Sequence, residues 1–263
     1  MAKILLVGDI VGYGRLAVGA QMSVLQPMGH SVANLPTALV SNNFSYQQYA
    51  LLDTTQYMRQ TMQTWSRLGF VFDVISIGFV ASDAQADMLI EFCMEQKRRG
   101  AIVLVDPIMA DNGRLYSGLS DDTIARLRRI VSLADITVPN YTEACYLTGT
   151  PFHAEGLTES QTGMLTDGVR RLGARSVLIT SCHVDGKACV IGYDAQTDQL
   201  SALPYREVPV QFHGTGDIFS AMLIGKILKG KPLLTAAQIT MEQLSALIDT
   251  NQDAEHKAEG LPL

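Results

Sequence analysis

Short apolar segments alternate with longer amphipathic segments along this chain of 263 residues, and this alternation limits its possible folds more than any other feature. The predicted strands are residues 4–7, 32–40, 74–77, 102–105, 136–138 and 177–180, with a hairpin at 188–193 and 199–204. The predicted helices are residues 15–28, 53–68, 84–99, 123–133, 158–172, 219–228 and 235–249. This order predicts an α/β fold with three layers, α/β/α, around a mostly parallel central sheet.

No linker or internal repeat interrupts the pattern, so we expect one domain over residues 1–263, with a polar tail at 251–260 that is frayed or docks late. Sheets of this kind bind ligands beyond the carboxyl ends of their strands. The segments expected at that edge are residues 8–14, 77–80, 106–111, 138–143 and 180–183.

The sharpest local motif is Gly214-Thr215-Gly216-Asp217, which runs directly into a predicted helix. Glycines let backbone N–H groups approach a ligand closely, and the start of a helix favours an anion. Asp217 then lies beside that anion, where a carboxylate can take a proton from an attacking hydroxyl. The alternative is structural: Thr215 caps the helix and Asp217 only complements its dipole.

Two further motifs carry polar side chains to the same edge. Asn140 and Glu143 follow a strand and can hold a phosphate oxygen and the water shell of Mg²⁺, although the same pair is typical of a helix capping box, which we favour for this motif alone. Asp106 and Asp111 flank a loop and can face a nucleotide or its metal. Alternatively, turns at Asp106-Pro107 and Asn112-Gly113 account for the same residues without a function.

Taken together, the three motifs supply what phosphoryl transfer needs, namely anion stabilisation, metal charge and positioning. A P-loop is excluded, because the chain has no Gly-x-x-x-x-Gly-Lys-Ser/Thr motif. The glycines of residues 8–14 lack the spacing of a dinucleotide fingerprint.

The overall composition excludes several other classes of function. The net charge of −6 offers no basic field for a nucleic-acid backbone. The first residues lack the long apolar region of a signal peptide, and no stretch approaches the roughly 20 apolar residues that cross a bilayer. The four cysteines have neither metal spacing nor a dense disulfide pattern. We therefore expect a cytoplasmic protein with free, buried thiols and no nucleic-acid or membrane partner.

With these motifs in their order and spacing, the chain resembles the pyridoxal/pyridoxamine kinase branch of the ribokinase-like superfamily, which also contains the hydroxymethylpyrimidine kinases. The resemblance runs from about Lys3 to Leu228. The segments that carry it are residues 9–15, 35–42, 106–116, 139–143 and 214–217.

The resemblance implies a ribokinase-like fold and transfer of a phosphoryl group from ATP, with Mg²⁺, to the hydroxymethyl group of a small ring of the vitamin B6 type. It gives Asp217 the role of base and Gly214, Thr215 and Gly216 that of anion hole. The nucleotide side that it implies consists of Asp106, Asp111, Asn140, Glu143 and Thr180, with Asp106 and Glu143 toward the metal. The ring side that it implies consists of Asp9, Val11, Leu16, Asn43, Phe44 and Phe79. It also implies a homodimer, and a role for a monovalent cation stays open.

One departure alters the expected ring pocket. Familiar pyridoxal kinases carry a His-Thr pair where this chain has Asn43-Phe44, and the side chain of Phe44 cannot form a hydrogen bond. A lost substrate hydrogen bond can shift discrimination strongly. The choice among pyridoxal, pyridoxamine, pyridoxine and a hydroxymethylpyrimidine therefore stays open. A rival from another class is a binding protein that has kept the fold and lost catalysis.

Overall fold

The computed structural model describes residues 1–43, 46 and 48–263 of the chain. Its strands are β1 (Lys3–Tyr13), β2 (Ser31–Asn42), β3 (Leu51–Asp53), β4 (Val74–Ile77), β5 (Ile102–Val105), β6 (Ala110–Asp111), β7 (Arg114–Leu115), β8 (Ile136–Thr137), β9 (Ser176–Val184), β10 (Lys187–Asp194) and β11 (Gln199–Pro204). Its helices are α1 (Ala17–Leu25), α2 (Thr55–Arg67), α3 (Asp83–Arg98), α4 (Asp121–Val131), α5 (Tyr141–Thr148), α6 (Glu159–Arg170), α7 (Thr215–Leu228), α8 (Leu233–Thr250) and the short 3-10 helix η2 (Lys257–Glu259).

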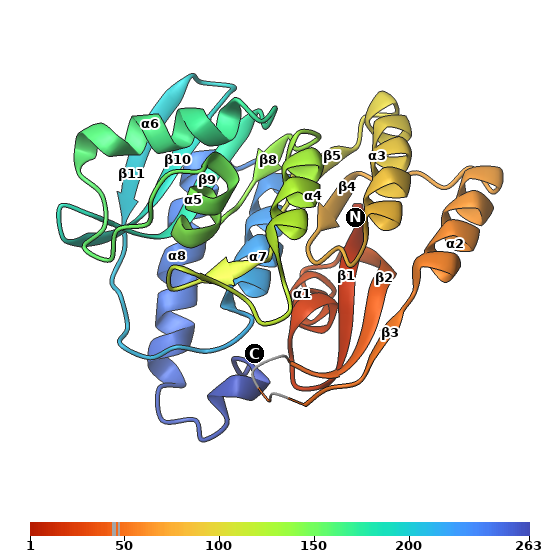
Figure 1. Cartoon of the computed structure of the whole chain (residues 1–263), viewed down its shortest axis with the longest axis horizontal. Helices are drawn as coiled ribbons and strands as arrows, with labels where there is room; N and C mark the ends of the chain where they lie inside the picture. Colours follow the sequence, from red (N-terminus) through yellow and green to blue (C-terminus); the bar gives the residue numbers. More distant parts are fainter. Residues whose placement is uncertain (44–45, 47) are drawn as a thin grey trace.

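Within this described part, nine strands form the central sheet in the order β11-β10-β9-β8-β5-β4-β1-β2-β3. The neighbours from β9 through β8, β5, β4 and β1 to β2 pair in parallel. Only the outer pairs, β9–β10, β10–β11 and β2–β3, are antiparallel. Helices lie on both sides of this sheet (Figure 1). The predicted three-layer fold with a mostly parallel sheet is thereby confirmed.

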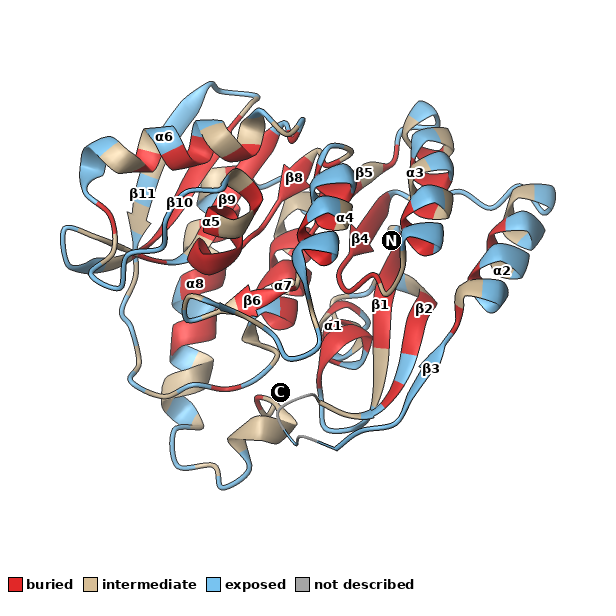
Figure 2. Cartoon of the chain, viewed as in Figure 1, coloured by how far each residue is buried: buried red, intermediate tan, exposed pale blue. Residues whose placement is uncertain are grey.

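Two apolar cores separate the three layers, because neighbouring residues of a strand point to opposite faces of the sheet. In β1, Leu5 and Val7 join the core that packs against α2 to α6, whereas Ile4 and Leu6 join the core that packs against α1, α7 and α8. All four side chains are buried. The red inner surfaces of the elements in Figure 2 follow these two cores.

Several elements differ from the sequence prediction. The first strand runs on to Tyr13, because residues 10–13 pair with β2 beyond a bulge at Gly8 and Ile10. Helix α7 begins at Thr215, four residues before the predicted start. The prediction placed a helix start at Asn140 and a turn at Asn112-Gly113 but gave no extent for α5, and it missed the short β3 and the pairing of β6 with β7. The turn residues Asn112 and Gly113 have φ angles of 50° and 76°. A two-residue turn with both φ angles positive is the usual way to close a tight hairpin.

The polar tail is docked in this structure. Residues Lys257–Glu259 form η2, and Leu261 beyond them is fully buried in the core beside α7 and α8. The four cysteines are free and buried, as predicted. Among the described residues, no helix has both the length and the apolar character needed to span a membrane.

Candidate active site

The glycine turn before α7 has the geometry that the sequence predicts for an anion site. Gly214 is the N-cap of α7 and adopts a left-handed conformation with φ of 76°. No side chain of the described residues caps this helix, and the hydroxyl of Thr215 instead donates to the carbonyl of Phe212 (3.4 Å). The interpretation of Thr215 as the cap is therefore wrong. The first N–H groups of α7 have no acceptor within the helix, which leaves them directed at a ligand.

Asp217 is buried in the first turn of α7. Its Oδ2 accepts a hydrogen bond from the backbone N–H of Ala17 (3.0 Å), and its Oδ1 accepts a longer one from Gln21 (3.5 Å). Burial, with the charges of Asp106 and Asp9, raises the pKa of Asp217 from 3.8 to about 8. This carboxyl group is therefore near both Asp106 and Asp9, and its pKa lies in the range that suits a general base.

Asp106 follows β5 and faces the same glycine turn. Its Oδ2 accepts a hydrogen bond from the hydroxyl of Ser220 (3.0 Å), and a Cβ atom added to Gly216 would lie 3.8 Å from that oxygen. Burial is the main cause that raises the pKa of Asp106. A buried carboxyl group beside an anion-binding turn needs a cation, a proton or both.

Asn140 and Glu143 form the capping box of α5. Glu143 accepts N–H bonds from Asn140 (2.8 Å) and from Met109 (3.0 Å), and Asn140 Nδ2 donates to the carbonyl of Ala110 (2.8 Å). The capping interpretation is confirmed. Burial, and next the charge of Asp106, raise the pKa of Glu143 well above its usual value, so the two carboxyl groups are close enough to interact.

The β6–β7 hairpin carries Asp111 to the rim of the site. Asp111 accepts hydrogen bonds from the side chain of Gln211 (3.0 Å) and from the backbone of Asn112 (2.9 Å). The turn interpretation of Asn112-Gly113 is confirmed. Thr180 lies within β9 and does not end it, because β9 continues to Val184. The N–H of Thr180 donates to the carbonyl of Pro139 (2.9 Å) and ties β9 to the Asn140 turn.

The predicted ring side gathers around the end of β1. Asp9 is buried, and burial raises its pKa to about 6. Leu16 is also buried, and a Cβ atom on Gly214 would lie only 2.8 Å from its Cδ2. Phe79 packs in a small cluster with Ala38 and Val40 of β2.

The three remaining ring-side predictions have different outcomes. Val11 is half-buried in the last part of β1. Asn43 donates from Nδ2 to the carbonyl of Ala258 (2.6 Å), so its amide group reaches the C-terminal tail. Phe44 lies outside the described residues.

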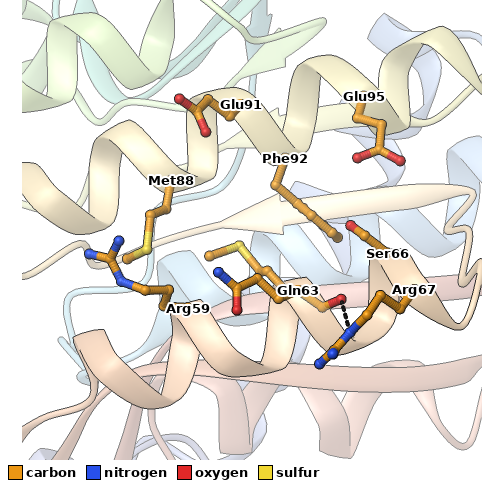
Figure 3. A pocket seen from close by; sticks show the side chains of 9 residues that line it. Arg59, Gln63, Ser66, Arg67, Met88, Glu91, Phe92 and Glu95 are labelled. Carbon is orange, nitrogen blue, oxygen red and sulfur yellow. Dashed lines mark hydrogen bonds between the residues drawn. The ribbon is translucent and has the colours of Figure 1, made fainter.

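A separate hollow of about 480 Å³ lies between α2 and α3, away from this edge of the sheet (Figure 3). Arg59 and Arg67 line it from α2, and Glu91 and Glu95 line it from α3. Among the described residues that line this hollow, none is a predicted site residue. We therefore assign the chemistry to the strand ends and not to this hollow.

Sequence reasoning missed several contacts in the site. Ser220 lies three residues after Asp217 on one helix face, a spacing that could have signalled its approach to the site. Ala17 acts through its backbone and has a positive φ of 49°, which residue type does not reveal. Tyr116, on the segment after the hairpin, has its pKa raised by burial and by the carboxylates of Glu143, Asp111, Asp106 and Asp217.

These buried carboxyl groups predict that stability depends on pH. Asp9 and Asp217 have folded-state pKa values of about 6 and about 8, above the ordinary 3.8. The folded state therefore binds more protons than the unfolded state, so the stabilisation is complete below about pH 4 and is lost as pH rises to about 8. We expect the melting temperature to fall between pH 5 and 8. In Asp217→Asn the decline should be flatter, by up to about 1.4 kcal/mol per pH unit. Parallel declines in the two proteins would contradict these pKa values.

Comparison with known proteins gives three results. Residues 18–261 match the model of the phosphomethylpyrimidine kinase family. The pyridoxal kinase of Corynebacterium diphtheriae is 27% identical, over 97% of this chain and 91% of its own. A Bacteroides thetaiotaomicron protein described as a phosphomethylpyrimidine kinase and crystallised with pyridoxal is 29% identical. Its TM-score is 0.91, over 99% of this chain and 92% of its own.

A further structure shares the fold at lower identity. The pyridoxal kinase of Leishmania donovani in complex with ADP and pyridoxamine has a TM-score of 0.82 at 21% identity, over 99% of this chain and 92% of its own.

Proposed function

The chain belongs to the phosphomethylpyrimidine kinase family, and on that premise we propose that it transfers the γ-phosphoryl group of ATP to the hydroxymethyl group of a vitamin B6 vitamer. The single observation that carries this proposal is that Asp217 lies close to the glycine turn and to the ring-side residues Asp9 and Leu16. The ADP and pyridoxamine bound by the Leishmania kinase of the same fold, and the pyridoxal bound by the Bacteroides relative, support this pairing of reactants.

In the proposed mechanism the N–H groups at Gly214, Thr215 and Gly216 hold the phosphoryl group as its charge shifts. Asp217 accepts the proton of the substrate hydroxyl while that oxygen attacks the γ-phosphorus, and the bond from this phosphorus to the β,γ-bridging oxygen breaks to release ADP. The N–H of Ala17 fixes the orientation of the carboxyl group through its bond to Oδ2. A general base at this position contributes roughly 10²–10⁴-fold to the rate. Asp9, Val11, Leu16, Asn43, Phe44 and Phe79 surround the ring in this proposal.

The donor set on the nucleotide side fits Mg²⁺. Asp106 and Glu143 are buried carboxyl groups, the charge of Asp106 raises the pKa of Glu143, and Mg²⁺ prefers such oxygens together with phosphate and water. Among the described residues no group of three or more His, Cys, Asp or Glu side chains forms a metal site. The ion would therefore rely on the nucleotide and water, and it would neutralise charge on the phosphates. Asp111, Asn140 and Thr180 complete the nucleotide side of the proposal.

Changing Glu143 to Gln is expected to raise the Mg²⁺ concentration needed for half-maximal rate. The amide keeps one oxygen for the N–H of Asn140 but removes the negative charge that faces Asp106. The measurement is a titration of Mg²⁺ at saturating ATP, with heat unfolding to check the fold. An unchanged titration would leave Glu143 with the capping role alone.

A substrate panel tests the proposed function. We expect ATP consumption, with a phosphorylated product, for at least one of pyridoxal, pyridoxamine and pyridoxine. The family description makes hydroxymethylpyrimidine the second candidate, and a clear preference for it would overturn the B6 assignment. Stabilisation by ATP without turnover of any of these alcohols would instead support a non-catalytic binding protein.

Four broader expectations belong to the same proposal. We propose that the chain acts in the cytoplasm, in salvage of vitamin B6, and that residues 1–263 work as one kinase domain. We further propose a homodimer, which sedimentation would test. None of these expectations bears on the mechanism within one chain.

A further inference from the structure

The C-terminal segment 257–261, which we name the tail clamp, forms hydrogen bonds with three separate segments around the proposed site. The carbonyl oxygen of Lys257 accepts the N–H of His213 (3.2 Å). The carbonyl oxygen of Ala258 accepts the side-chain amide of Asn43 (2.6 Å). The C-terminal end lies beside the ends of β1 and β2 in Figure 1.

The third contact is with the loop between β1 and α1. The carbonyl oxygen of Glu259 accepts the N–H of Arg15 (2.6 Å), and the carboxylate of Glu259 accepts the hydroxyl of Tyr13 (2.9 Å). Gly14 and Gly260 allow this close approach. A Cβ atom on Gly14 would lie 2.9 Å from the carbonyl oxygen of Glu259, and one on Gly260 would lie 2.3 Å from that of Arg15.

These contacts end close to the reacting groups. Arg15 is two residues before Ala17, whose N–H orients the carboxyl group of Asp217. His213 directly precedes Gly214, the first residue of the anion turn. Leu261 is fully buried and anchors the end of the clamp in the core beside α7. The clamp thus joins the loop that orients the proposed base to the turn that holds the proposed anion.

We propose that the tail clamp is a positioning element for the alcohol substrate, and that it sets the geometry between the hydroxyl, Asp217 and the Gly214 turn. Its hydrogen bonds to other parts of the chain go to Tyr13, Arg15, Asn43 and His213. Within the described residues, none of its hydrogen bonds reaches Asp106, Asp111, Asn140, Glu143 or Thr180. The clamp therefore acts on the alcohol, on the base and on the start of the anion turn, and we expect the affinity for ATP to change little, because the other proposed nucleotide residues lie outside its hydrogen bonds. The kinetic part of this inference rests on the proposed function.

The test is the substitution Gly260→Ala, with Gly100→Ala as its matched control. Both glycines have positive φ, 103° and 97°, so both changes strain the backbone. Only at Gly260 does the new Cβ clash with a neighbouring segment, since nothing lies within 4 Å of the position at Gly100. We expect Gly260→Ala to lower kcat/KM for the alcohol by roughly 10–100-fold, the scale of a displacement near 1 Å. The KM for ATP should stay within about twofold of wild type, as it should for Gly100→Ala.

A second measurement tests the inference independently of enzyme activity. Amide hydrogen exchange in Gly260→Ala is expected to accelerate at Arg15, Ala17 and His213, while core amides such as Leu5 keep their protection. If Gly260→Ala does not fold, Tyr13→Phe is the second variant, because it removes one hydroxyl group from an exposed residue. It should lower kcat/KM for the alcohol by less than the roughly 10–100-fold expected for Gly260→Ala.

Unchanged exchange at these three amides, or equal losses for ATP and the alcohol, would overturn the tail clamp. A wild-type protein that phosphorylates none of the tested alcohols would refute the proposed function, and the exchange result would still decide the clamp.

Discussion

Replacing Asp217 by Asn is expected to lower kcat by roughly 10²–10⁴-fold, the usual scale for a positioned general base. The amide can still accept the N–H of Ala17 through its oxygen, so the local structure is retained while the ability to take a proton is lost. Because the asparagine does not become charged, the variant should also be more stable than wild type at pH 8.

The measurement is product formation with the best alcohol from the panel, together with heat unfolding. Asp194→Asn is a matched control. Asp194 is a buried aspartate that accepts one backbone N–H, from Gln196 (2.9 Å), at the far end of β10. The control should keep its kcat. Near-normal turnover in a folded Asp217→Asn protein would remove Asp217 from the role of base.

The second large effect is expected for Gly214→Ala, with a loss in kcat of roughly 10²-fold. Gly214 has a φ of 76°, and its new Cβ would lie 2.8 Å from Leu16 and 3.6 Å from the carboxylate of Asp217. The added methyl group therefore displaces the turn, the side chain of Leu16 or the carboxylate of Asp217. Each of these shifts disturbs the alignment on which transfer depends.

Gly230→Ala provides the matched control at the other end of the same helix. Gly230 has a φ of 79°, and nothing lies within 4 Å of its added Cβ, so the backbone strain is similar and the clash is absent. Steady-state kinetics should separate the two variants, with Gly230→Ala close to wild type in kcat. Equal rates in both variants would show that the turn does not need the geometry we assign to it.

The fold was predictable from sequence where residue patterns alone decide the structure. The continuous apolar run of residues 4–7 predicts a strand buried on both faces, and in the structure Ile4 and Leu6 join one core and Leu5 and Val7 the other. The capping box of Asn140 and Glu143 was predictable for the same reason, because its bonds are local. The continuation of β1 to Tyr13 depends on pairing with β2 beyond a bulge, which no local pattern specifies.

The site was predictable as a set of residues but not as a set of contacts. Asp106 and Asp217 are distant in sequence, and only the packing of α7 beside the end of β5 lets their charges interact. Interactions of backbone groups were the hardest to predict from sequence. The N–H of Ala17 and the carbonyl oxygens of the tail clamp form hydrogen bonds that do not depend on the side chain. The polar tail also has no hydrophobic periodicity that would predict where it docks.

The central claim is that Asp217 reaches the substrate hydroxyl, and a crystal structure with pyridoxamine, Mg²⁺ and a non-hydrolysable ATP analogue tests it most directly. We predict that the hydroxymethyl oxygen lies about 3 Å from a carboxylate oxygen of Asp217, which is hydrogen-bond reach. The γ-phosphate should lie at the Gly214 turn. A hydroxymethyl group that contacts other residues and lies out of hydrogen-bond reach of Asp217 would contradict the account.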